Sequence, residues 1–208
     1  MKFRWTHGVL FFVGAQVVSF GLAAAVKAAR ARSKKPAIPP PDRKDWEGTA
    51  VSEREEPRYY KELRQPIFAP PSSAFAPAWT ANCILSIWGL QRVLNMPRDR
   101  PGRREFLASQ AVSWLCFVSF SAAFFSLRSP INSAIITTID LASTVTGLGV
   151  AITRLKDRDA ALSLSTLTPW LMLATPTALA VAAWNRDEFY QAGPFLNSPR
   201  GWQKETNR

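Results

Sequence analysis

The residues of this chain best suited to recognition chemistry lie between positions 59 and 80. The stretch carries four prolines and five aromatic side chains, and it runs into an apolar segment. Proline restricts the backbone, whereas aromatic rings offer flat apolar surfaces on which a ligand can stack. The composition predicts a rigid, aromatic-lined entrance to a membrane helix, because neither a soluble core nor an ordinary membrane loop requires it.

Side chains for covalent or metal chemistry are scarce. His7 is the single histidine, and Cys83 and Cys116 lie in apolar stretches without CxxC spacing. A metal centre or a His-dependent triad needs a denser set of such groups. We therefore expect no enzymatic activity, no metal site and no required cofactor, and we interpret both cysteines as small apolar fillers.

The elements that must position the aromatic residues are membrane helices. Crossing a hydrocarbon core of about 30 Å takes roughly 20 helical residues. Five apolar windows have this length, and their Lys and Arg residues stay close to the ends: 8–28, 75–95, 106–127, 131–153 and 160–184. Short loops make neighbouring helices antiparallel. The sequence predicts an all-α integral membrane protein with five transmembrane helices in an up-down bundle.

This prediction divides the chain into four segments. They are a first transmembrane helix (1–28), a long loop rich in proline and charge (29–65), four further helices with short loops (66–185) and a polar tail (186–208). The composition of the long loop favours extended or irregular chain. Its aromatic residues leave two interpretations open, a solvated linker and a lid or partner-binding arm.

The net charge of +11 indicates a membrane partner rather than a nucleic acid. Basic residues flank membrane helices because they interact with anionic headgroups. The charges at the two ends conflict, so the orientation stays open. Asp140 is the one acid inside a predicted span. A proton or substrate contact is one open role for it, and an interhelical hydrogen bond or a contact with another subunit is the other.

Three motifs resemble those of the TspO/MBR family, the translocator proteins also called tryptophan-rich sensory proteins or peripheral-type benzodiazepine receptors. The first is the family's aromatic and proline signature before its second helix. It is matched by Tyr59-Tyr60, Leu63, Pro66, Phe68, Pro70-Pro71-Ser72, Phe75, Pro77 and Trp79-Thr80. The second is a Phe-Phe turn at 124–130, and the third is the start of the last helix at 157–171. The resemblance implies a TspO-like five-helix bundle.

The resemblance also implies a ligand cavity for tetrapyrroles, sterols or lipids. The residues expected to line it are Tyr60, Phe68, Phe75, Trp79, Phe117 and Phe120. Polar and Trp positions of the family's third and fifth helices are replaced here, so a lipid or sterol tail suits the cavity better than a porphyrin with carboxylates. Alternatively, Phe117, Phe120 and Met172 fill the space. An additional Pro176 is expected to kink the last helix.

Two functions therefore remain open. One is a non-enzymatic TspO-type membrane protein that binds a tetrapyrrole, sterol or lipid. The other is a structural accessory subunit of a larger membrane complex, such as a respiratory complex, that keeps the fold without the ligand site. Residues 29–65 and 186–208 are the expected contacts of a homodimer or larger complex. We favour a mitochondrial membrane, with a bacterial membrane as the alternative.

Overall fold

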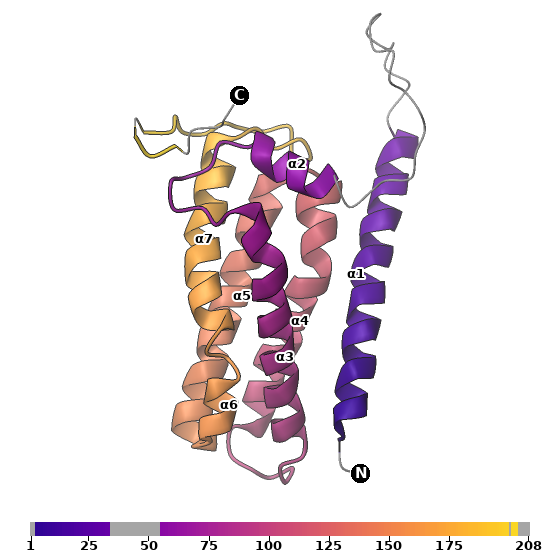
Figure 1. Cartoon of the computed structure of the whole chain (residues 1–208), viewed down its shortest axis with the longest axis vertical. Coiled ribbons are helices and arrows are strands. Elements are labelled where there is room, and N and C mark those ends of the chain that lie inside the picture. The colour runs from indigo at the N-terminus through magenta and orange to yellow at the C-terminus, as the bar shows by residue number, and fades with distance from the viewer. Residues whose placement is uncertain (1–2, 34–54, 200, 204–208) are drawn as a thin grey trace, which may run out of the picture.

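The computed structural model describes residues 3–33, 55–199 and 201–203, and most of these residues are helical. The long helices are α1 (Trp5–Ser33), α3 (Phe75–Leu94), α4 (Arg103–Ser121), α5 (Pro130–Val150) and α7 (Leu167–Trp184). The short ones are α2 (Glu55–Glu62), α6 (Arg158–Leu162), the 3-10 turn η1 (Ser72–Ala74) and the π-helical turns η2 (Ala122–Ser126) and η3 (Ala151–Leu155). Figure 1 shows the long helices running side by side, with α2 and the C-terminal segment lying across one end.

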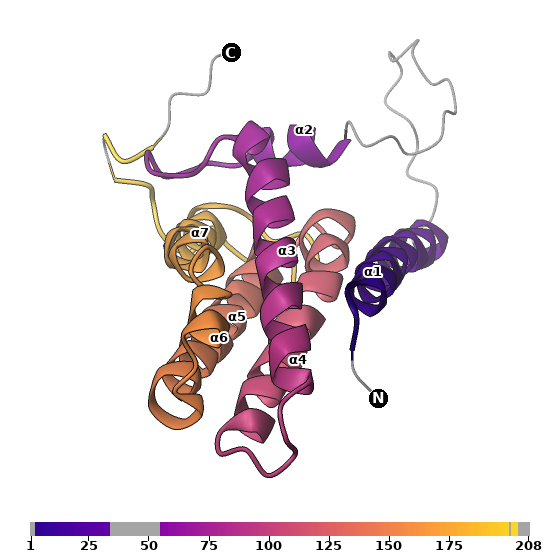
Figure 2. The same ribbon diagram turned by 60° about the horizontal axis from the view of Figure 1, so that its bottom comes forward.

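Four helical stretches of the described chain are long and apolar enough to cross a membrane. They are Trp5–Arg32, Arg103–Ser126, Pro130–Leu155 and Arg158–Trp184, and each coincides with a predicted span. The remaining predicted span, 75–95, is α3, which contains 20 residues and so extends about 30 Å. It runs among the other helices in both views (Figures 1 and 2). The prediction of an all-α membrane protein with an up-down helix bundle is confirmed.

The predicted turns between the helices are present, and local capping explains where they lie. Ser129 caps α5 by accepting a hydrogen bond from the backbone N–H of Asn132 at 3.2 Å, and Pro130 follows at the first helical position. Asp157 caps α6 in the same way, through the N–H of Ala160 at 2.8 Å. Both caps begin the next helix immediately after a tight turn, so neighbouring helices reverse direction.

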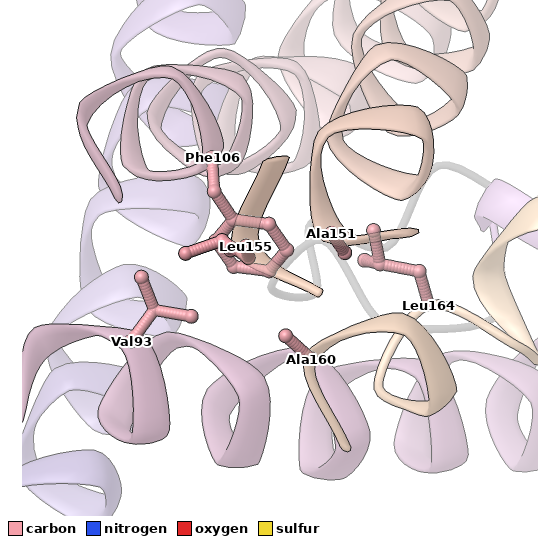
Figure 3. Close-up of a cluster of buried hydrophobic side chains, with 6 residues drawn as sticks. All are labelled: Val93, Phe106, Ala151, Leu155, Ala160 and Leu164. Atoms are coloured by element: carbon pink, nitrogen blue, oxygen red, sulfur yellow. The ribbon is translucent and has the colours of Figure 1, made fainter. Parts of the chain in front are cut away.

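A compact apolar core fixes the end of the bundle that carries α6. Figure 3 shows its six side chains pointing toward one another: Val93, Phe106, Ala151, Leu155, Ala160 and Leu164. All six are fully buried. Burying a large apolar side chain contributes about 1.5–3 kcal/mol relative to leaving it in water. The core therefore anchors the lower ends of α3 and α4 while their opposite ends approach the aromatic entrance.

Two expectations about regular structure need correction. The predicted last span, 160–184, is interrupted by a turn at 163–166 between α6 and α7. In this turn Ser163 donates its hydroxyl hydrogen to the Ala160 carbonyl at 2.7 Å, which satisfies a carbonyl at the end of α6.

The expected irregular loop 29–65 contains helix α2, which buries Tyr59 and Tyr60. Most of that loop, 34–54, lies outside the described residues. Helix α7 continues through Pro176.

Candidate functional site

A cavity of about 440 Å³ lies between α1 and the α3–α4 pair, at the end of the bundle where α2 crosses. Helix α3 supplies Phe75, Ala76, Trp79, Thr80 and Cys83 to its lining. Helix α1 supplies Phe12, Gln16, Ser19 and Phe20. The other lining residues are Tyr60, Ser72, Phe117, Phe120, Ser121 and Phe125. Aromatic rings from α1, α2, α3, α4 and η2 therefore meet around one space.

The structure brings together five of the six residues predicted to form the site. Tyr60, Phe75, Trp79, Phe117 and Phe120 all line the cavity. Phe68 does not, since its side chain is 38% exposed and lies outside the lining. It belongs to a segment that pairs with the tail, where the backbone N–H of its neighbour at position 67 donates to the carbonyl of residue 202 at 2.9 Å.

The contribution of α1 was not predicted from the sequence. A signal for it exists, because Gln16 and Ser19 lie three positions apart and are the polar residues of the otherwise apolar stretch 8–26 of α1. Residues at this spacing lie on the same helix face. Ser19 is only 6% exposed, and both side chains face the cavity rather than lipid. The expectation that Met172 helps to fill the space is wrong, since its side chain is 62% exposed.

Ring-to-ring contacts hold the cavity walls in place. The Trp79 ring lies 5.2 Å from that of Phe117 and 6.5 Å from that of Trp170, measured between centroids. The Phe75 ring packs edge-on against Tyr60 at 5.2 Å and Trp170 at 5.4 Å. Such geometries add about 0.5–1.5 kcal/mol per pair beyond simple burial. The stacking surfaces are thus ordered before a ligand arrives.

Tyr60 connects the entrance segment to the cavity wall. Its hydroxyl donates a hydrogen bond to the Pro70 carbonyl at 3.1 Å, and the amide of Gln65 donates to the Tyr60 carbonyl. Burial raises the pKa of Tyr60 to about 12, so the phenol stays neutral at physiological pH. It therefore presents the cavity with a neutral ring rather than a charge.

An ion-pair clasp fastens the end of α1 to the rest of the bundle. Arg30 donates to a carboxylate oxygen of Glu188 and, at 3.0 Å, to the carbonyl of Ser126. Arg128 donates to the other carboxylate oxygen of Glu188 at 3.3 Å. Burial favours the neutral acid, but these hydrogen bonds and charges lower the pKa of Glu188 below its usual value. The clasp joins residues 158 positions apart, and the sequence offered no sign of it.

The tail behind this clasp is fixed by the fully buried carboxylate of Asp187. One oxygen accepts from the Ser129 hydroxyl at 2.6 Å and from the backbone N–H of Ile131 at 3.0 Å. The other accepts from the N–H groups of Phe189 and Tyr190, both at 2.9 Å. A carboxylate with this many donors at the start of α5 also complements the helix dipole. The tail is thereby joined to the bundle.

Asp140 lies within the bundle and does not line the cavity. It is 3% exposed, and it is hydrogen-bonded to Ser113 of α4 and to Thr144 one turn along its own helix, the latter at 3.4 Å. This is the interhelical hydrogen bond that the sequence left open as one of two roles. Cys83 and Cys116 are free thiols, both buried. Within the described residues, no three His, Cys, Asp or Glu side chains are grouped so that they could hold a metal ion.

A model of one protein family matches this chain, and it is the family that the three sequence motifs resemble. The model described as the TspO/MBR family matches residues 46–184, which is more than half of the chain. The chain belongs to the TspO/MBR family. The match includes the aromatic entrance and α3 to α7, whereas α1 and the tail after residue 184 lie outside it. No curated protein matches the chain.

The cavity of this TspO/MBR protein has mostly apolar walls. Of the described residues that line the cavity, none carries a formal charge. The polar groups of its lining residues are hydroxyls, one amide, one thiol and one indole N–H, from residues such as Gln16, Cys83 and Trp79. Pockets of 300–1,000 Å³ with apolar walls and few polar groups are typical small-molecule sites.

Proposed function

We propose that this TspO/MBR protein is a non-enzymatic membrane protein that binds a neutral, largely apolar ligand in the cavity between α1, α3 and α4. The observation that carries the proposal is the aromatic-walled cavity of about 440 Å³ with uncharged described lining residues. A flat sterol or lipid ring system can stack against Trp79 and Phe117.

None of those lining residues is a cation, so the cavity disfavours ligands with negative charge. A tetrapyrrole with two carboxylates would bring charge into a low-dielectric space, where an unpaired charge is strongly unfavourable. A neutral sterol or lipid meets no such penalty. We therefore expect neutral ligands to bind more tightly than protoporphyrin.

A quenching titration in mild detergent tests this function. The flat, neutral hydrocarbon fluorene is titrated against tryptophan fluorescence, with protoporphyrin as the charged competitor. We expect one fluorene per chain, weaker protoporphyrin binding, and a loss of up to about tenfold in fluorene affinity for Trp79→Ala, since one aromatic contact is worth about 0.5–1.5 kcal/mol.

The matched control is Trp88→Ala, on the same helix. Trp88 is 36% exposed and does not line the cavity, so its removal should leave the affinity unchanged. Equal loss in both variants, or no saturable binding by the folded wild-type chain, would refute the proposal.

A second candidate function is that of an accessory subunit in a larger membrane complex. We propose that such a complex would lie in a mitochondrial membrane. The observation that favours it is a set of exposed apolar side chains on the anchored tail. Phe189, Tyr190, Phe195, Leu196 and Trp202 are each 50–62% exposed. Native mass measurement after mild extraction tests it, and a chain that always migrates as a monomer or dimer would speak against it.

A further inference from the structure

A second, much smaller void of about 20 Å³ lies directly behind the cavity wall. Trp79, Cys83 and Phe117 line both spaces and so form the partition between them. The small void extends toward the bundle interior, because the rest of its lining comes from deeper positions: Asn82, Ser86, Ser113, Trp114 and Leu167.

Two residues that line this small void carry hydrogen-bond donors without acceptors. Among the described residues, four buried side-chain polar atoms have no hydrogen-bond partner, and two belong to the lining: Asn82 Nδ2 and Trp114 Nε1. Asn82 is 3% exposed and Trp114 is 8% exposed. Buried polar groups in folded proteins are nearly always paired, so two unpaired donors beside one void indicate an acceptor that belongs there.

The two serines that line the void are already engaged. The Ser86 hydroxyl donates to the side-chain carbonyl of Gln110 at 2.8 Å, and Ser113 is hydrogen-bonded to Asp140. These bonds leave the Asn82 amide and the Trp114 indole as the donors in need of a partner.

We propose that the small void is a binding site for a single hydrogen-bond-accepting oxygen, supplied by a bound water or by a carbonyl group of the cavity's ligand. Its size is suited to one such atom, since a water needs about 10–15 Å³ of this measure. A carboxylate or phosphate is too large and would bring an unpaired charge. When the oxygen comes from the ligand, rotation of Trp79 or Phe117 admits it, and this part of the inference rests on the function proposed above.

The site itself can be tested in the ligand-free protein. Tryptophan is labelled with ¹⁵N, and the indole signal of Trp114 is assigned as the one lost in Trp114→Phe, which removes the N–H and keeps a ring. A magnetisation-transfer signal between water and this indole shows an oxygen of water in the void. The signal does not depend on any ligand, so it separates failure of the site from failure of the proposed function.

The ligand-derived oxygen is tested with fluorenone and fluorene, which share a flat tricyclic frame and differ by one carbonyl. We expect wild type to bind fluorenone about fivefold more tightly than fluorene, as for one net hydrogen bond, and Trp114→Phe to lose that preference. Trp88→Phe, which removes an indole away from both spaces, should keep it.

The two experiments together distinguish four outcomes. A water signal at Trp114 that fluorenone abolishes supports the site with the ligand as the source of the oxygen. A water signal that persists, without preference for fluorenone, supports the site with resident water. A Trp114 indole with no water signal and no fluorenone preference overturns the inference. If neither probe binds but the water signal is present, the site stands and the proposed ligand function fails.

Discussion

Replacing Gly89 by alanine should destabilise the bundle, because α3 passes closest to the turn after α6 at this glycine. A Cβ built at Gly89 would lie 2.4 Å from the Cβ and 2.0 Å from the Oγ of Ser163. Rotating the Ser163 hydroxyl could relieve the second contact but not the first, since a Cβ moves only with its backbone. The Ser163 hydroxyl also bonds the Ala160 carbonyl, so moving it would disturb the end of α6.

The size of the effect follows from these distances. Carbon atoms in contact prefer about 3.5–4.0 Å, so the two backbones must separate by about 1 Å. Overpacking of this kind costs about 1–3 kcal/mol. Alanine recovers up to about 1 kcal/mol through its better helix propensity. Taking about 2 kcal/mol for the overpacking leaves a net loss of about 1 kcal/mol, which corresponds to a fall in Tm of about 2–4 °C for a chain of this length.

The two buried thiols provide the assay, because a thiol-reactive dye labels Cys83 and Cys116 only when the bundle opens. Thermal unfolding in detergent is compared for wild type, Gly89→Ala and Gly149→Ala. No atom lies within 4 Å of a Cβ built at Gly149, so that control should unfold at the wild-type temperature or slightly above it. A Tm for Gly89→Ala equal to or above that of wild type would refute the reasoning from close helix approach.

Three further predictions follow from charge and volume. Arg92 hydrogen-bonds both oxygens of Asp157 at 2.7 and 2.8 Å, which lowers the pKa of that carboxyl. The ion pair stabilises the folded state fully above the unfolded pKa of about 3.9, and this stabilisation is lost as pH falls through the lower folded pKa. Asp157→Asn should therefore reduce Tm at pH 7 and make the decline of Tm below about pH 4 less steep. Glu188→Gln weakens the clasp on Arg30 and should lower fluorene affinity by about two- to fivefold in the quenching titration; unchanged affinity would mean that the clasp does not set the position of α1. Ser19→Phe places a ring in the cavity and should reduce affinity by about tenfold with little change in Tm, whereas undiminished binding would locate the ligand elsewhere.

Much of the fold was predictable because hydropathy and turn chemistry act locally. A run of about 20 apolar residues forms a helix in a membrane, whatever its neighbours are, because its backbone must satisfy its own hydrogen bonds. The turns at 126–130 and 154–159 were predicted for a similar reason, since Ser129 and Asp157 cap the helices that follow them. The interruption at 163–166 was missed, because the turn contains neither Gly nor Pro, the residues that most often mark a break in a helix.

The candidate site was predicted only on the side where a motif marks it. The resemblance of the entrance motif to the family signature implied Tyr60, Phe75 and Trp79 as lining residues, and all three line the cavity. Phe68 belongs to the same motif, yet it faces outward beside the tail. A motif specifies which residues occur together, but the direction of each side chain depends on which distant segment packs against it.

The sequence by itself determined the membrane helices, their antiparallel order and the family, because each depends on composition or on residues close together in the chain. Only the tertiary structure decided that α1 forms a wall of the cavity, that Arg30 meets Glu188, and that Asn82 and Trp114 line the same small void. The physical reason is that lipid and protein interior are both apolar. Hydropathy therefore does not reveal which face of a helix meets another helix, and contacts between distant residues appear only once the helices are packed.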